Sequence, residues 1–191
     1  MSKYEQVRAL ATKWEGCTKC DLSKDRPGEP VILFGPTNCD LLIVTEAPAG
    51  NHQTAMGPEE SQMLLDITTK LNIDRQKTTI THTVGCQPKA NEFAPVDCVV
   101  ACRPRLIDIV ELTNPKVVIL LGSAAYFSWT GNKERLVAEE LGEIQEDTFR
   151  EVIWSYDFSR YIREKNTNKD VAAEMGLKIF EHWKWVAEKL K

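Results

Sequence analysis

The stretch from Asp40 to Gly50, DLLIVTEAPAG, constrains the fold of this chain more than any other. Consecutive apolar residues at 41–44 lead into Glu46, and Pro48 follows almost at once. A short continuous apolar run is typical of a strand buried on both faces, as in a parallel sheet. Ligands bind beyond the carboxyl ends of such strands. We therefore expect Glu46 to stand at the mouth of a sheet, although a strand that merely ends in an acidic turn would have the same pattern.

Strand-like and helix-like patterns alternate along the rest of the chain. Apolar residues at helical spacing predict helices at 2–15, 59–71, 98–112, 123–129, 133–140 and 169–190. Short β-rich runs predict further strands at 78–84, 116–121 and 151–155, with a hairpin strand at 31–34. This alternation is typical of an α/β protein, a three-layer α/β/α sandwich around a mostly parallel sheet. We expect one domain over residues 1–191 that closes with a C-terminal helix (168–191).

Composition narrows the class of protein. The 28 acidic residues outnumber the 24 Lys and Arg, for a net charge of −4, which argues against a surface coated in basic residues but not against local patches. No apolar run approaches the length of a membrane span, and the N-terminus, MSKYEQVRAL, is not a signal peptide. We expect a cytoplasmic protein without a membrane partner, in which six cysteines would not form a disulfide framework.

The spacing of the cysteines predicts a thiolate site. Cys17 and Cys20 form a C-x-x-C, and Cys86, Cys98 and Cys102 fall close together much later. Four thiolates hold either zinc or an iron–sulfur cluster. From spacing alone, the second pair is either Cys86 with Cys102 or Cys98 with Cys102. Two other interpretations remain: the late cysteines are small buried hydrophobes, or the chain is a zinc-stabilised interaction module.

Four segments, taken together and in order, resemble the iron–sulfur uracil-DNA glycosylases, families four and five of the uracil-DNA glycosylase superfamily. They are CTKCDL at 17–22, FGPTNCDLLIVTEAP at 34–48, GCQPKANEFAP at 85–95 and CRPRLIDIVELTNPKVVILLG at 102–122. The second is similar to the entry into motif one, which typically reads G-E-A-P-G. The fourth resembles C-x-P-x-L followed by P-K-V-I-V-x-L-G. The resemblance covers about residues 14 to 160.

The resemblance implies a 4Fe–4S cluster bound by Cys17, Cys20, Cys86 and Cys102. It also implies the superfamily's fold and a monofunctional DNA glycosylase that flips a base out of duplex or single-stranded DNA, because the glycosidic bond is inaccessible in a stacked duplex. We expect a monomer. The expected substrate contacts are Ala47, Ala49, Gly50, Gly57 and Asn91. The expected DNA contacts are Arg103, Arg105, Arg160 and Arg163.

The departures from the family pattern fall on the base pocket. An aromatic residue normally follows motif one and stacks on uracil, but here Glu59 stands at about that place. His82 takes the position of the Asn that recognises the uracil edge, four residues before the third cysteine. Asp157, in SYDFS, replaces the His of the T-x-H-P-S motif. The plainer interpretations are a histidine hydrogen-bonded within the sheet and a surface aspartate after a strand.

The predicted chemistry is glycosidic cleavage. Glu46 would stabilise an oxocarbenium-like state and deprotonate a water. Asp157 would accept a hydrogen bond from an exocyclic amino group, as carboxylates do from cytosine N4, or, if protonated, donate to the leaving base. His82 would donate to a carbonyl oxygen or act as an acid.

These departures predict a glycosylase for a modified pyrimidine, such as a 5-substituted cytosine of phage DNA, with a role in antiviral defence. Two alternatives remain open. One is a uracil-DNA glycosylase of base-excision repair. The other is an inactive iron–sulfur protein that only binds DNA.

Overall fold

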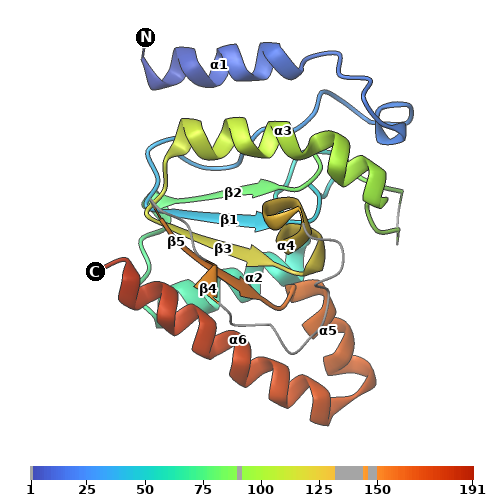
Figure 1. Cartoon of the computed structure of the whole chain (residues 1–191). Coiled ribbons are helices and arrows are strands. Elements are labelled where there is room, and N and C mark those ends of the chain that lie inside the picture. Colours follow the sequence, from blue (N-terminus) through green and yellow to red (C-terminus); the bar gives the residue numbers. More distant parts are fainter. Residues whose placement is uncertain (1, 90–91, 132–143, 146–149) are drawn as a thin grey trace.

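A computed structural model describes residues 2–89, 92–131, 144–145 and 150–191 (Figure 1). The strands are β1 (Leu41–Thr45), β2 (Thr78–His82), β3 (Val117–Leu121), β4 (Ile144–Gln145) and β5 (Glu151–Ser155). They form one sheet in the order β2-β1-β3-β5-β4. The first four in this order are parallel to one another, and β4 pairs antiparallel with β5. The predicted mostly parallel sheet is therefore confirmed.

The helices lie close to their predicted bounds, with one exception. They are α1 (Lys3–Trp14), α2 (Pro58–Lys70), α3 (Val96–Thr113), α4 (Ser123–Thr130), α5 (Phe158–Thr167) and α6 (Lys169–Lys189), with 3-10 turns η1 (Asp21–Ser23) and η2 (Arg75–Lys77). Helix α5 was not predicted. The helix predicted at 133–140 lies outside the described residues. The predicted hairpin strand contributes only an isolated antiparallel bridge between Phe34 and Ile80. None of the described helices is long and apolar enough to cross a membrane.

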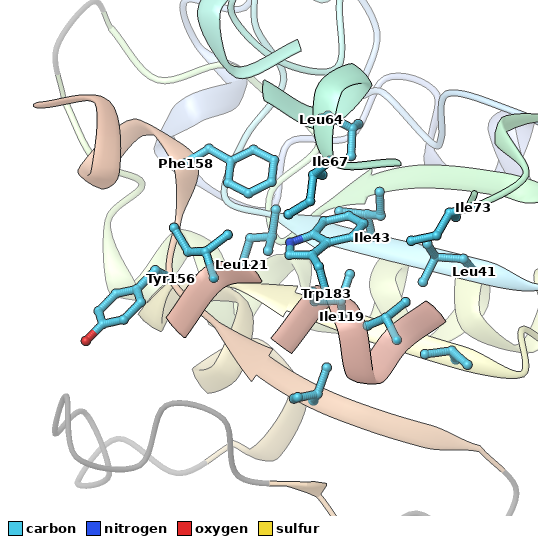
Figure 2. Packing of buried hydrophobic residues seen from close by; sticks show 14 of the residues in the cluster. Leu41, Ile43, Leu64, Ile67, Ile73, Ile119, Leu121, Tyr156, Phe158 and Trp183 are labelled. Atoms are coloured by element: carbon cyan, nitrogen blue, oxygen red, sulfur yellow. The ribbon is translucent and has the colours of Figure 1, made fainter. Parts of the chain in front are cut away.

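Alternate residues of the central strands face two separate cores. Leu42 and Val44 of β1 pack with side chains of α3 and α4, whereas Leu41 and Ile43 pack with α2 and α6 around Trp183 (Figure 2). Helix α1 lies outside α3, with Leu10 and Trp14 against Ile109 (Figure 1). Helices thus cover both faces of the sheet, and the α/β/α sandwich is confirmed. Because both faces are covered, every residue of β1 and β3 is buried.

The carboxyl ends of β1, β3 and β5 meet at one edge of the sheet. Glu46 follows β1, Gly122 follows β3 and Asp157 lies two residues beyond β5. Gly122 has φ +85°, and a Cβ there would lie 3.0 Å from the Cβ of Asp157. Asp157 caps α5, since its Oδ1 accepts from the Ser159 amide at 2.8 Å. A tight turn and a helix cap therefore bring Asp157 to the edge that holds Glu46.

Candidate functional site

Two cavities at this edge form one continuous cleft, called the cleft below. The larger, of about 440 Å³, is lined by the end of β1, by residues from 55 to 60, and by residues 87–89 and 92–93. The smaller, of about 370 Å³, runs toward α4 and α5. Five residues line both cavities: Glu46, Phe93, Leu121, Asp157 and Ser159. A cleft at the carboxyl ends of parallel strands is where an open α/β sheet binds its ligand.

Glu46 lies at the centre of the cleft. The Ala94 amide donates a hydrogen bond to its Oε1, which fixes the carboxyl group. Burial raises the pKa of Glu46 above its usual value; the Ala94 amide opposes this, and the charge of Asp157 adds to it. A carboxylate with a raised pKa is a stronger base than an ordinary one, which suits it to taking up a proton.

Asp157 and Glu60 are among the further carboxyl residues that line the cleft. The Asp157 side chain accepts two hydrogen bonds at Oδ1, from the amide and the hydroxyl of Ser159. Glu60, in the first turn of α2, accepts from the Gly57 amide at 2.7 Å. Burial raises the pKa of Glu60, the Gly57 amide lowers it, and the charge of Asp157 raises it further. The sequence placed Glu59 where the family has its stacking aromatic residue, and Glu59 is exposed. Glu60 was not singled out; its signal is its place as the third residue of a helix, where a Glu reaches back to the cap.

His82 lies behind the lining of the cleft, not in it. Its side chain is fully buried, its Nε2 donates to the Ala55 carbonyl at 2.9 Å, and its ring meets Phe34 edge-on. Burial lowers the pKa of His82 to about 3, so the ring is neutral near pH 7. With its N–H held by Ala55, this placement argues against His82 as an acid that touches the base.

Thr45 forms the floor of the cleft beside His82. The two residues are paired in register, so their side chains lie on the same face of the sheet. Thr45 Oγ1 and His82 Nδ1 are both buried, and neither has a hydrogen-bond partner among the described residues. Buried polar atoms are nearly always paired. The cleft lining therefore contains a buried hydroxyl, that of Thr45, with unused hydrogen-bonding capacity. The sequence analysis did not single out Thr45.

Three of the five predicted substrate contacts line the cleft: Ala47, Ala49 and Gly57. Gly50 does not. Its backbone has φ +55°, and a Cβ at this position would lie 2.7 Å from Thr54 Oγ1. The turn therefore requires glycine here. Asn91 lies outside the described residues.

The four predicted DNA-contacting arginines separate into different environments. Arg160 and Arg163 are exposed on α5 and line the smaller cavity. Arg103 donates to the carbonyls of Ser128 and Trp129 and so caps the end of α4.

Arg105 is fully buried, and the prediction that it contacts DNA was wrong. Its guanidinium donates to the backbone carbonyls of Val31, Ile32 and His82 and to Cys102 Sγ. A buried guanidinium with these partners cannot meet a phosphate.

The four cysteines that the resemblance indicated line one small cavity, called the cysteine cavity below; they are Cys17, Cys20, Cys86 and Cys102. The Gly85 amide and Arg105 Nε each donate to Cys102 Sγ at 3.4 Å. Cys98 is buried and does not line this cavity. Across the part of the chain that the structure describes, no three His, Cys, Asp or Glu side chains converge closely enough to hold a single metal ion.

The cysteine cavity has the chemistry of a site for a soft, cationic group. Burial raises the pKa of Cys20 to about 11, with neighbouring thiols adding to the effect, and burial also raises that of Cys86. These thiols ionise only when a cation supplies the compensating charge. Arg26 contributes positive charge, since it lowers the pKa of Cys86 and donates to the Cys17 carbonyl at 2.8 Å. N–H donors directed at sulfur tune thiolate-bound clusters.

Cys86 lines the cysteine cavity, and hydrogen bonds tie the next residue, Gln87, to the turn at 51–52. Gln87, which follows Cys86 and lines the cleft, donates from its amide to His52 Nε2 at 2.8 Å and accepts from the Asn51 amide at 2.9 Å. His52 Nδ1 in turn contacts the Glu29 carbonyl at 3.0 Å. Asn51 and His52 both have left-handed backbones, with φ of 54° and 67°. Sequence reasoning missed this connection, because its partners lie tens of residues apart.

The fold and the cleft define an α/β/α protein with a carboxylate-lined site at the carboxyl edge of its sheet, and comparison with known proteins specifies the family. Residues 32–176 match the model of the uracil DNA glycosylase superfamily. The chain is 30% identical over 141 residues to the type-4 uracil-DNA glycosylase of Pyrobaculum aerophilum, covering 69% of this chain and 67% of that protein. It is 26% identical over 160 residues to the type-4 enzyme of Saccharolobus solfataricus, covering 80% and 71%.

A more distant relative is the type-4 uracil-DNA glycosylase of Thermotoga maritima, 23% identical over 146 residues and covering 74% of each chain. The chain belongs to the uracil-DNA glycosylase superfamily. The predicted family and the predicted enzyme class, a DNA glycosylase, are therefore confirmed.

Proposed function

We propose that this protein hydrolyses the N-glycosidic bond of a flipped pyrimidine in DNA, with Glu46 as the carboxylate that faces the sugar. The observation that carries this proposal is the position of Glu46: central in the cleft, partly buried, and fixed by the Ala94 amide. A flipped nucleotide needs such a recess, because the enzyme must take the base out of the stack.

The reaction requires two contributions from Glu46. Its negative charge stabilises the oxocarbenium character that develops on the sugar as the C1′–N bond breaks. Water then adds to C1′, and Glu46 takes the proton that the water gives up, while the electron pair of the broken bond leaves with the base. The raised pKa of Glu46 makes it a better proton acceptor than an ordinary carboxylate.

Two carboxylates of the cleft, Asp157 and Glu60, favour a pyrimidine with an amino group over uracil. Asp157 and Glu60 present carboxylate oxygens, which accept hydrogen bonds when ionised. Cytosine offers the N4 amino donor to such an acceptor, whereas uracil has a carbonyl oxygen at the same place. The small side chains of Ala47 and Ala49 leave room for a substituent on the ring. These features support a 5-substituted cytosine as the substrate.

A role in defence against phages that carry such bases follows from this substrate. The second candidate is excision of uracil in base-excision repair, which the names of the relatives favour: each is a type-4 uracil-DNA glycosylase. The identity of the released base decides between the two.

A 4Fe–4S cluster on Cys17, Cys20, Cys86 and Cys102 forms the second part of the proposal. Support comes from the shared cavity and from the N–H donors aimed at Cys102 Sγ. With all four thiolates bound, the cluster would crosslink the chain after α1 to the segment after β2 and to α3. The purified protein should be brown and contain iron and acid-labile sulfide in equal amounts; a colourless protein that contains zinc would overturn the cluster.

A base panel tests the substrate. Single-stranded and duplex oligonucleotides carry uracil, cytosine, 5-methylcytosine, 5-hydroxymethylcytosine or its glucosylated form at one position, and alkaline cleavage reports abasic sites. We expect cleavage at a 5-substituted cytosine and none with Glu46→Gln. Cleavage at uracil alone would establish the second candidate. Salt-sensitive DNA binding without cleavage of any base would identify a protein that has lost catalysis.

A further inference from the structure

Phe93 is a large apolar side chain left in solvent at the mouth of the cleft. It is 69% exposed, in the short loop before α3. It lines both cavities and so stands where they join. An exposed aromatic ring at the entrance of a recess is more often a contact for a ligand than a structural element.

The other aromatic rings of the cleft are already packed; they are Trp154, Tyr156 and Phe158. Phe158 stacks on Trp183 with ring centres 5.9 Å apart, and Trp154 stacks on Tyr126 at 4.3 Å. Each of the three is at most 8% exposed. Phe93 is therefore the ring, among the described lining residues, whose face is open to a ligand.

The loop that carries Phe93 is tied to the reacting carboxyl group. The next residue, Ala94, donates its amide hydrogen to Glu46 Oε1. Pro95 follows as the N-cap of α3, so the loop is fixed on that side as well. The backbone beside Phe93 is thus held at the Glu46 carboxyl group, and both side chains line the two cavities.

We infer that Phe93 stacks on the flipped base and supplies the aromatic face that the segment after Gly57 lacks. This inference rests on the proposed function and deepens it by naming the residue that holds the base. Stacking tolerates different bases, since each has a π face. The choice among bases then falls to two carboxylates that line the same cleft, Asp157 and Glu60.

Substitutions at Phe93 test the inference on the full chain. Phe93→Ala and Phe93→Leu should lower kcat/KM by about 10- to 100-fold, as loss of a base–aromatic stack does, and Phe93→Tyr should stay within a few-fold of wild type. The loss should be equal on single-stranded and duplex substrates. Val100→Ala serves as the control, because Val100 is also apolar and exposed but lies outside the lining of the cleft.

Two outcomes would overturn the inference. Full activity of Phe93→Leu would show that bulk suffices, and a loss confined to duplex substrates would make Phe93 a wedge that fills the gap in the DNA. Binding supplies a readout that does not need catalysis. In a Glu46→Gln background, Phe93→Ala should weaken binding of the oligonucleotide with the modified base and leave unmodified DNA unaffected. If the wild type cleaves no base, the proposed function fails, while this binding difference still decides the role of Phe93.

Discussion

The cysteine cavity and the cleft lie on either side of the segment 85–89, and they differ in how far they keep the family pattern. The cavity contains cysteines at all four expected positions, with amide and guanidinium donors aimed at sulfur. The cleft keeps Glu46 but presents Asp157 and Glu60, and no His or Asn side chain among its described lining residues. The comparison indicates that the cysteine positions of the family are retained, whereas the residues that line the cleft have changed.

Glu46→Gln should give the largest effect and tests whether the retained part of the cleft is catalytic. The amide keeps the size and an acceptor for the Ala94 amide but cannot take a proton, so excision should fall by about 10²- to 10⁴-fold. A single-turnover assay on the preferred substrate measures this. A rate within a few-fold of wild type would remove Glu46 from the mechanism.

The same variant should not lose stability. Because the folded-state pKa of Glu46 is raised, its ionisation costs stability as the pH rises from the unfolded-state value through the folded-state value. At neutral pH Glu46→Gln avoids this cost, so its Tm should match or exceed that of wild type. The difference in Tm between the variant and wild type should vanish at a pH below the unfolded-state pKa of Glu46. A lower Tm for the variant at neutral pH would contradict the raised pKa of Glu46.

Cys102→Ala and Cys98→Ala form a matched pair one turn apart on α3. Cys102 lines the cysteine cavity and Cys98 does not. We expect Cys102→Ala to lose most of its iron and several degrees of Tm, at about 2–4 °C per kcal/mol for a chain of this size, whereas Cys98→Ala keeps its iron. Equal loss of iron in both variants would show that the ligand set is wrong.

Asp157→Asn should change both the rate of excision and the pH dependence of that rate. Loss of a charge-assisted hydrogen bond to an amino group should slow excision of a 5-substituted cytosine by about 10- to 100-fold. The charge of Asp157 is one cause of the raised pKa of Glu46, so the acid limb of the rate profile should move to lower pH. Asp66→Asn, an exposed change on α2, is the control. An unmoved acid limb would contradict the coupling.

Thr45→Val should give the smallest effect, and its sign is informative. Thr45 Oγ1 is buried without a partner among the described residues, so its removal should stabilise the free protein by about 1 kcal/mol. Thr68→Val is the contrast, because the buried Thr68 hydroxyl donates to the Leu64 carbonyl at 2.7 Å, and its loss should destabilise by about 1 kcal/mol. Chemical denaturation measures both. A destabilised Thr45→Val would mean that the hydroxyl has a partner, such as a bound water.

Some elements escaped sequence prediction for physical reasons. Helix α5 was missed because it is short and polar overall, and Phe158 is its only buried residue. Arg105 was misplaced because its carbonyl partners, in the segment 31–32 and at His82, lie far away in the sequence. Glu60 was missed because its place in the cleft depends on where α2 begins; Glu59, one residue earlier, is exposed.

The sequence by itself determined the four parallel strands of the sheet, most of the helices and the place of Glu46 at the end of the first strand. These follow from local signals: continuous apolar runs, helical periodicity, and a Pro and Gly that end a strand. Only the tertiary structure decided which charged groups face the cleft, which are buried, and that Phe93 stands at the entrance. Burial and hydrogen bonding depend on partners from distant segments, such as Ala94 for Glu46 and Ala55 for His82, and no local pattern encodes those pairings.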